Sequence, residues 1–297
     1  MKVLVVCGPT ASGKTALAVD CARALRSEVI SADSMLVYKG LDIGTAKPTK
    51  EEMGGIRHHL IDVAGPTQSF SVSDYEALAL PVLERLLSEG KTPVVCGGTG
   101  FYIRALLYKS GFGHAGGSAE IRAKYAKFLE ENGKEALHDL LKEKDPASAE
   151  ILHPNDVKRV VRALEIFDLT GKRKSEQNDL PLPRFDFTAV CIGYPREELY
   201  ARIDRRVEKM VEAGLFREVE ELLEKGVPQT AQCMQGIGYK EVAEGLRLRL
   251  SADEIAENIK KNTRNYAKRQ ITFFKRMPDL TVLPPEESCA AKVLELL

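Results

Sequence analysis

The stretch GPTASGKT, residues Gly8 to Thr15, directly follows the apolar run VLVV and decides the fold class. It matches the P-loop pattern G-x-x-x-x-G-K-[ST], in which backbone N–H groups at a helix N-terminus cradle phosphates. We predict that Lys14 neutralises phosphate oxygens and that the Thr15 hydroxyl holds Mg²⁺. The pattern does not show whose phosphates bind. The predicted phosphate-binding residues are Gly8, Pro9, Thr10, Ala11, Ser12, Gly13, Lys14 and Thr15.

Short, nearly continuous apolar segments elsewhere are typical of strands buried on both faces of a parallel sheet. They lie at 2–8, 28–34, 58–64, 93–99 and 187–194. Helical segments are expected between them, at about 13–25 and at 73–89, the second opened by the capping pattern Ser73-x-x-Glu76. This alternation predicts an α/β fold, a P-loop NTPase-like parallel sheet with flanking helices.

The alternation stops after about residue 112, where Gly111, Gly113, Gly116 and Gly117 mark a joint. Residues 118–175 have the pattern of charged amphipathic helices, and the segment LPLPRFDF from Leu180 leads back to the sheet. We therefore predict an all-helical insertion domain at 113–185, and a core domain made of 1–112 and 186–297. Residues 195–276 are expected to be helical, with Ser251-x-x-Glu254 capping the last long helix.

The composition limits the class of protein. A chain of 297 residues that is 44% hydrophobic can bury a core in one large or two ordinary domains. Its six cysteines form no C-x-x-C pair, which predicts reduced, buried thiols. No apolar leader or run of 18 apolar residues is present, so we expect a cytoplasmic protein without a membrane partner. The absence of an obvious exposed apolar helix face predicts a monomer.

Acidic residues end two of the predicted strands. Because ligands of such sheets bind beyond the carboxyl ends of the strands, Asp33 in SADS is expected beside the P-loop. Position alone leaves three roles open for Asp33: a Mg²⁺ ligand, a general base, or a cap for the following turn. Asp62 could assist a metal, although a structural role is favoured, and His58 and His59 are also interpreted as structural.

The glycine-rich segment GGTGFY, residues 97–102, is expected at the same sheet edge, where its backbone can approach a ligand or form a tight turn. Two basic clusters stand out in a chain with 43 basic and 43 acidic residues. One places Lys158, Arg159 and Arg162 on a helix of the insertion. The other runs from 260 to 276, where helical spacing aligns four cations and favours a polyanion partner: Lys261, Arg264, Lys268 and Lys275.

These features together predict a P-loop enzyme with an acid beside the phosphates and a separate surface for a polyanion. A small-molecule kinase would account for the P-loop and the acid but not for the basic helix. A non-catalytic RNA-binding module would account for neither the P-loop nor Asp33.

The ordered set of segments resembles the tRNA dimethylallyltransferase family, also called tRNA isopentenyltransferases, of the bacterial type. The similarity extends from residue 3 to about 276, and the stretch 31–48 is far more specific than a P-loop. The segments are GPTASGKT, SADSMLVYKGLDIGTAKP, HHLID, GGTGFY, HPNDVKRVVRALEIF, QGIGYKE and NTRNYAKRQITFF.

The resemblance implies a reaction and roles for matching residues. The family transfers a dimethylallyl group from dimethylallyl diphosphate to an adenosine next to the tRNA anticodon. The P-loop would hold the leaving diphosphate with Mg²⁺, assisted by Thr10, Lys14 and an arginine, for which Arg202 is the best match and Arg205 a weaker one. Asp33 would be the general base. The residues expected to contact the tRNA anticodon stem-loop are Asp33, Ser34, Met35, Leu36, Thr99, Arg122, Lys158, Arg159, Arg162, Lys261, Arg264 and Lys268.

Two positions depart from the family pattern. Many relatives have Gln where this chain has Leu36, and Trp where it has Phe273. A polar contact to the base is therefore in doubt at the first position, and an indole hydrogen bond is impossible at the second. A related class that prenylates free adenine nucleotides remains an alternative, although it would need neither the insertion nor the basic helix.

Overall fold

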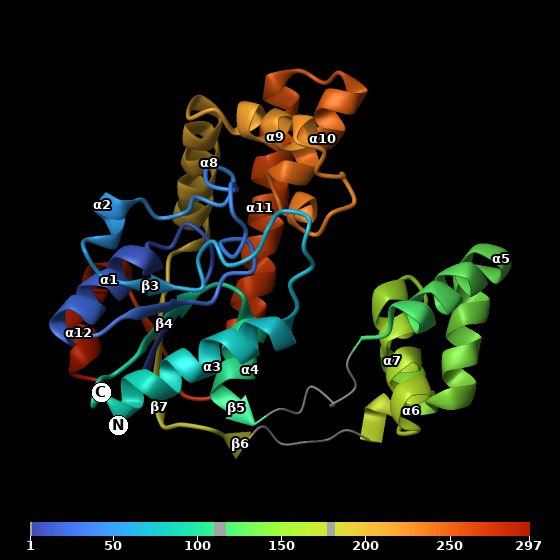
Figure 1. The fold of residues 1–297 in the computed structure, drawn as a ribbon, viewed down its shortest axis with the longest axis horizontal. Helices are drawn as coiled ribbons and strands as arrows, with labels where there is room; N and C mark the ends of the chain where they lie inside the picture. The colour runs from blue at the N-terminus through green and yellow to red at the C-terminus, as the bar shows by residue number, and fades with distance from the viewer. Residues whose placement is uncertain (1, 110–116, 177–181) are drawn as a thin grey trace. The chain divides into compact units, whose positions relative to one another are not determined.

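The computed structural model describes residues 2–109, 117–176 and 182–297. The chain divides into two compact units (Figure 1): a sheet unit, Met1–Leu107 with Phe185–Leu297, and a helical unit, Tyr108–Arg184. The predicted start of the insertion at 113, and the start of its return linker at Leu180, lie outside the described residues.

The sheet unit contains a six-stranded parallel sheet in the order β3-β2-β4-β1-β7-β8. This sheet confirms the predicted α/β class and the five predicted strands. Flanking helices bury the central strands on both faces. A sixth strand, β8, was not predicted. The strands are β1 (Val3–Cys7), β2 (Val29–Ser31), β3 (His58–His59), β4 (Val94–Gly97), β7 (Phe187–Ile192) and β8 (Leu280–Leu283).

The third strand is shorter than the predicted 58–64. It ends at His59, because Leu60 and Asp62 adopt positive φ angles of 63° and 56° that turn the chain out of the sheet. The Asp62 carboxylate lies 2.5 Å from Lys47 Nζ, and His59 Nε2 lies 2.6 Å from the Glu28 carboxylate. These pairs agree with the structural roles expected of Asp62 and His59.

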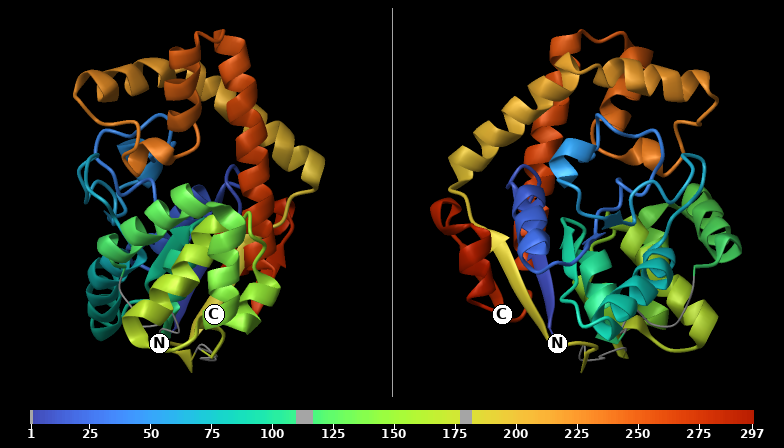
Figure 2. Two further views of the ribbon diagram at one scale, coloured as in Figure 1. Left: turned by 90° about the vertical axis from the view of Figure 1, so that its right-hand side faces the viewer. Right: turned by 60° about the vertical axis from the view of Figure 1, so that its left-hand side comes forward.

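Helices cover both faces of the sheet (Figures 1 and 2): α1 and α12 lie on one side, and α3 and α4 on the other. Helices α8 to α11 extend beyond the carboxyl ends of the strands, where the site is expected. The helices of this unit are α1 (Lys14–Ala24), α2 (Lys50–Met53), α3 (Val72–Ser88), α4 (Gly100–Leu107), α8 (Arg196–Glu212), α9 (Leu215–Glu224), α10 (Tyr239–Leu248), α11 (Ala252–Phe274) and α12 (Ala290–Leu294).

The two predicted helix caps have different outcomes. Ser251 caps α11, accepting from Glu254 N at 3.3 Å while Glu254 accepts from Ser251 N at 2.8 Å, as predicted. The predicted cap at Ser73 is wrong. The cap of α3 lies two residues earlier, because Ser71 has an extended backbone and forms the reciprocal box with Asp74.

The helical unit packs three helices around an apolar cluster that includes Tyr125, Leu137 and Leu164. Helix α5 bends at Gly133, which has a φ of 82°. A short antiparallel ladder joins β5 (Tyr108–Lys109), which precedes the predicted insertion, to β6 (Leu182–Pro183) in the segment that leads back to the sheet. The helices are α5 (Ala119–Lys144), α6 (Pro146–Ile151) and α7 (Val157–Thr170). Within the described ranges, no helix of either unit has the length and apolarity needed to cross a membrane.

A carboxylate ties two helices of this unit together. Asp168 on α7 accepts hydrogen bonds from Lys144 and Tyr125 of α5 at 2.5 and 2.7 Å. Burial opposes ionisation, but the hydrogen bonds from Lys144, Tyr125 and Lys124 outweigh it and lower the pKa of Asp168 from 3.8 to about 2.

We predict that Asp168→Asn lowers the free energy of unfolding of this unit by about 2 kcal/mol at neutral pH. A carboxylate whose pKa is lower in the folded state stabilises the fold above its unfolded pKa. The stabilisation is therefore lost as the pH falls from about 4 to about 2. Denaturant unfolding of both proteins between pH 2 and 7 measures the difference, and a pH-independent gap would contradict the linkage.

Candidate active site

The phosphate loop joins β1 to α1 at the carboxyl edge of the sheet, as the sequence predicts. Gly8 and Gly13 have φ angles of 130° and 86°, and a Cβ on Gly8 would lie 2.7 Å from Cys191 Sγ. Glycine is therefore required at Gly8 for both conformation and space. Gly13 is the N-cap of α1, so the loop leads into a helix N-terminus, the usual position for binding phosphate.

Gln270 of α11 connects the phosphate loop to the turn after β4. Its buried side-chain amide accepts from Thr10 N at 2.9 Å and donates to Gly98 O at 2.9 Å. Sequence reasoning missed this residue, because a glutamine inside a basic helix gives no pattern of its own. The bond also means that the Thr10 amide is already used within the protein, so this predicted diphosphate donor is engaged by Gln270.

Three arginines of α8 lie near the loop, and the structure assigns them different contacts. Arg202 Nε donates to Ala11 O at 2.8 Å, and its guanidinium stacks on Tyr194. Arg205 is exposed. Arg206 NH1 donates to Thr10 Oγ1 at 3.2 Å and NH2 donates to Thr45 O at 3.4 Å. Arg206 therefore contacts the loop side chain directly, whereas Arg202 braces the loop through its backbone.

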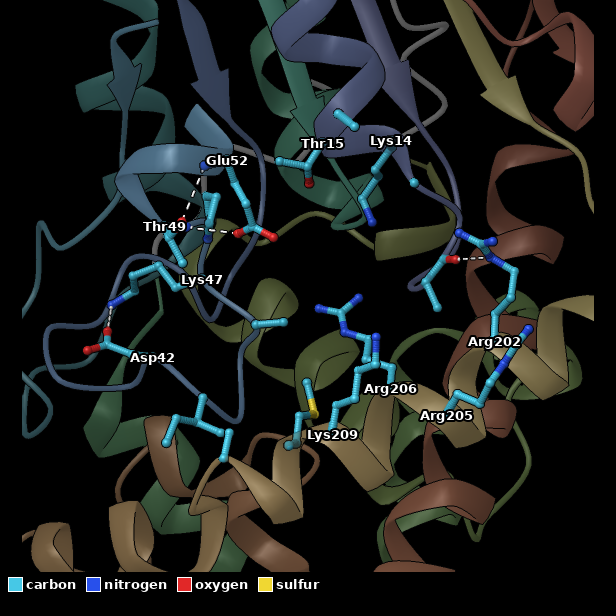
Figure 3. A pocket seen from close by; sticks show the side chains of 18 residues that line it. Lys14, Thr15, Asp42, Lys47, Thr49, Glu52, Arg202, Arg205, Arg206 and Lys209 are labelled. Carbon is cyan, nitrogen blue, oxygen red and sulfur yellow. Dashed lines mark hydrogen bonds and ion pairs between the residues drawn. The ribbon is translucent and has the colours of Figure 1, made fainter. Parts of the chain in front are cut away.

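Three cavities that share lining residues adjoin the phosphate loop and the arginines of α8. The largest, about 890 Å³, is lined by Lys14, Thr15 and a row of basic residues from α8 (Figure 3). A second, about 370 Å³, is lined by Asp33 and by residues of α11, and a third of about 90 Å³ lies between Thr15 and Asp33. Arg206 lines all three.

Burial raises the free-energy cost of the charged forms of Lys14 and Arg206. The pKa of Lys14 is lowered chiefly by burial and also by Arg206, whereas Cys96 and Asp33 raise it. Burial likewise lowers the pKa of Arg206, opposed by the Asp33 carboxylate. Two desolvated cations beside one carboxylate make this a site that favours an added anion.

Asp33 directly follows β2 and lies beside the phosphate loop, as expected. Its Oδ1 accepts from Met35 N at 2.9 Å and from Leu36 N at 3.4 Å, so it caps the following turn. Among the described residues, Oδ2 has no recorded hydrogen bond. Capping fixes the carboxylate and is compatible with a second role for its other oxygen.

Thr99 and Tyr266 complete the wall beside Asp33. Thr99 Oγ1 accepts from Ser34 N at 3.0 Å, which joins the turn after β4 to the turn after β2. Burial, together with the charge of Asp33, raises the pKa of Tyr266 to about 12, so this phenol stays protonated at neutral pH. Tyr266 was not predicted. It lies one helical turn from Gln270, so both project from one face of α11.

The donor set near Thr15 fits Mg²⁺. The described residues contain no cluster of three or more His, Cys, Asp or Glu side chains suited to a metal. Mg²⁺ nevertheless needs only one or two protein oxygens when phosphates and waters supply the rest. Thr15, Ser31 and Asp33 line the 90 Å³ cavity, and Ser31 Oγ is buried without a partner in the described residues. Oxygen ligands are thus available beside the phosphate loop.

The basic stripe of α11 does not lie beside the site. By helical spacing, Lys261, Arg264 and Lys268 are on the side opposite Tyr266 and Gln270. Arg264 NH1 is held by the Asp204 carboxylate at 2.6 and 2.8 Å, whereas Lys261 and Lys268 are exposed. Arg269, which was not singled out, lines the 370 Å³ cavity.

The cations predicted on the helical unit are engaged there to different degrees. Arg122 and Arg162 both pair with Glu165, which is fully buried, and Arg159 pairs with Asp156. Lys158 is exposed. Contact of these residues with tRNA stays a prediction.

The two departures from the family pattern, Leu36 and Phe273, both lie in well-defined surroundings. Leu36 lines the 90 Å³ cavity and adds no polar side-chain group. Phe273 packs edge-on against Phe101 at 5.5 Å between ring centroids, and its ring fills the space where Gly100 would carry a Cβ, 2.1 Å away. Packing at Phe273 therefore takes the place of an indole.

The fold and this site define a P-loop α/β transferase class, and comparison with known proteins identifies the family. A family model described as IPP transferase matches residues 36–277. The chain is 46% identical over 288 residues to a tRNA dimethylallyltransferase of Acetivibrio thermocellus, covering 96% of this chain and 92% of the relative. It is 45% identical over 280 residues to one of Bacillus licheniformis, covering 94% and 89%.

Solved structures agree. The full-length tRNA isopentenylpyrophosphate transferase of Bacillus halodurans superposes with a TM-score of 0.74 at 40% identity, covering 99% of this chain and 93% of that one. A eukaryotic dimethylallyltransferase, described as acting on tRNA, gives a TM-score of 0.81 at 31% identity over 96% of this chain and 74% of that one. The chain belongs to the IPP transferase family, and the resemblance seen in its sequence is confirmed.

We predict that Gln270→Glu weakens the affinity for inorganic diphosphate with Mg²⁺ by about tenfold or more. The carboxylate still accepts from Thr10 N, but it cannot donate to Gly98 O and adds a negative charge beside the phosphate site. Titration calorimetry on the full chain measures the effect. The exposed Gln229→Glu is the matched control, and equal affinity in both variants would refute the role of Gln270.

Proposed function

We propose that this protein transfers a dimethylallyl group from dimethylallyl diphosphate to the exocyclic amine of an adenosine adjacent to the tRNA anticodon, releasing diphosphate. The names of its relatives support this pair of substrates. The observation that carries the proposal is the position of Arg206. It lines both the cavity that contains Lys14 and the cavity that contains Asp33, so one cation faces the phosphate side and the base side together.

The phosphate loop would hold the leaving group. As the allylic C–O bond breaks, negative charge grows on the departing oxygen, and the loop amides, Lys14 and Arg206 would stabilise it. Preorganised donors of this kind are commonly the largest contribution to such catalysis. Arg206 would serve in this role beside Arg202, which lines the same cavity and whose Nε supports the loop backbone at Ala11.

Asp33 would be the general base. The adenine amine becomes acidic as its nitrogen bonds to carbon, and its proton must pass to a nearby acceptor. Backbone amides fix Oδ1 of Asp33, and Oδ2 would take the proton. The electron pair of the broken C–O bond leaves with the diphosphate, so charge balances without another reactant.

The adenosine would occupy the 370 Å³ cavity. An unpaired base is required there, and a loop nucleotide pays less to leave its stack than a paired one. Tyr266, Thr99 and Ser34 supply polar groups near Asp33. Leu36 contributes none. Exclusion of water matters, because water would capture a cation-like carbon.

Mg²⁺, when bound, would neutralise diphosphate oxygens and so improve the leaving group. Thr15 would hold it, with the Ser31 hydroxyl as a neighbouring oxygen donor. We expect the enzyme to act as a monomer in the cytoplasm.

We predict that Asp33→Asn lowers kcat by about 10²–10⁴-fold while tRNA affinity is kept. The amide preserves the shape of the residue but cannot accept the amine proton. The measurement is the mass of nucleosides from unmodified tRNA after incubation with dimethylallyl diphosphate and Mg²⁺. Failure of the unsubstituted protein to form prenylated adenosine would overturn the proposed function itself. Normal turnover by Asp33→Asn would overturn only the base assignment.

The proposed tRNA surface can be tested within one helix. We predict that Arg269→Glu weakens tRNA binding by about tenfold or more, because Arg269 lines the base cavity. Lys261→Glu with Lys268→Glu tests the stripe on the opposite face. Affinity measured over a range of salt concentrations compares the two. A larger loss from the double lysine change would restore the stripe as the main contact.

A further inference from the structure

The segment DIGTAKP, residues 42–48, belongs to the most distinctive stretch of the sequence, yet the reaction described so far gives it no role. In the structure it forms a wall shared by the cavities. Thr45 lines the 90 and 370 Å³ cavities, and Ala46 lines the 890 and 90 Å³ cavities. Its position therefore affects both the phosphate side and the base side.

One carboxylate from a distant helix holds this segment. Glu218, in the first turn of α9, accepts from Asp42 N and Ile43 N through Oε2, each at 2.8 Å. Its Oε1 accepts from Gly44 N at 3.0 Å. Three consecutive backbone amides thus converge on one anion, an arrangement that gives strong, charge-assisted hydrogen bonds.

A buried phenol completes the arrangement. Tyr239, the first residue of α10, donates its O–H to Glu218 Oε1 at 2.6 Å. The segment passes so close to this ring that a Cβ on Gly44 would lie 2.6 Å from Tyr239 Cε2. Tyr239 comes from QGIGYKE, another distinctive stretch, so two motifs without a role in the chemistry meet at Glu218.

The segment passes this constraint to the reacting groups through its backbone. Arg206 donates to Thr45 O, next to the amide held by Glu218, as well as to Thr10 of the phosphate loop. Lys47 fixes the far end of the segment by donating to Tyr38 O at 2.9 Å and to Asp42 Oδ1 at 2.6 Å. Moving residues 42–45 would therefore move the acceptor that orients Arg206.

From these contacts we propose that Glu218, with Tyr239, is a positioning residue that sets the Arg206 guanidinium against the diphosphate by fixing the backbone of residues 42–45. This inference rests on the role of Arg206 in the proposed function. Glu218 lines none of the three cavities, and Tyr239, which also lines the 370 Å³ cavity, acts on the phosphate side only through Glu218. Their effect should therefore appear in diphosphate affinity and disappear when Arg206 is removed.

The direct test is Glu218→Gln. Whichever oxygen becomes an NH₂ group, that group faces a backbone N–H, because each carboxylate oxygen accepts at least one amide. Diphosphate affinity with Mg²⁺ is expected to fall by about tenfold, and KM for dimethylallyl diphosphate to rise similarly. tRNA affinity should fall by less than diphosphate affinity, because Thr45 and Tyr239 line only one wall of the 370 Å³ cavity. Glu221→Gln, on the same helix but paired with Arg217 at the surface, is the control.

A double-mutant cycle separates positioning from general loosening of the fold. Arg206→Lys alone should weaken diphosphate binding, and adding Glu218→Gln should change it by less than about twofold. Arg196→Lys, at the exposed first residue of the same helix and outside the three cavities, should have no effect. The proposal would be overturned if the two losses of diphosphate affinity multiplied in the double variant. It would also be overturned if Glu218→Gln lost as much tRNA affinity as diphosphate affinity.

The outcomes also separate the two proposals. Unchanged diphosphate affinity in Arg206→Lys would refute the role of Arg206, and with it the positioning of Arg206 by Glu218. A weakened Arg206→Lys beside a normal Glu218→Gln would refute the role of Glu218 alone. Tyr239→Phe removes a single O–H from a retained ring and provides a milder version, expected to weaken binding by about twofold to fivefold. No loss there would contradict the role of Tyr239.

Discussion

The side-chain amide of Gln270 is the interaction on which the arrangement of the site depends. It joins the phosphate loop at Thr10 to the turn after β4 at Gly98, so the loops that follow two adjacent strands, β1 and β4, are held by one residue from α11. A buried amide with both ends bonded is costly to disturb, because either lost partner leaves a desolvated polar group. The loop is thereby fixed before any phosphate binds.

Side chains from the helices beyond the sheet fix the other loops in a similar way. Arg202 supports Ala11 and Arg206 bridges Thr10 and Thr45, while Glu218 gathers the amides of 42–44. In each case a polar side chain satisfies backbone groups of a loop that would otherwise need water. The helices α8 to α11 therefore act as a frame that shapes loops carried by the sheet. This explains why residues far apart in the sequence are required for one site.

The sequence was sufficient for the fold class, the phosphate loop and the placement of Asp33, because these follow from short apolar strands and from the common edge of a parallel sheet. It was insufficient for β8, whose four residues carry no periodic signal, and for the end of β3, which depends on positive φ at Leu60 and Asp62. Gln270, Arg206 and Glu218 could not be assigned roles, because their importance arises from tertiary contacts. Helical spacing aligned the lysines of α11 correctly but could not show that the opposite face lines the cavity.

In the proposed reaction the phosphate loop holds a leaving group, and no phosphoryl group is transferred. The most direct test uses dimethylallyl diphosphate labelled in its terminal phosphate, incubated with the protein, Mg²⁺ and unmodified tRNA. All released label is expected to be intact diphosphate, in equal amount to the prenylated adenosine formed. Label appearing as orthophosphate, or covalently on the tRNA or the protein, would contradict it.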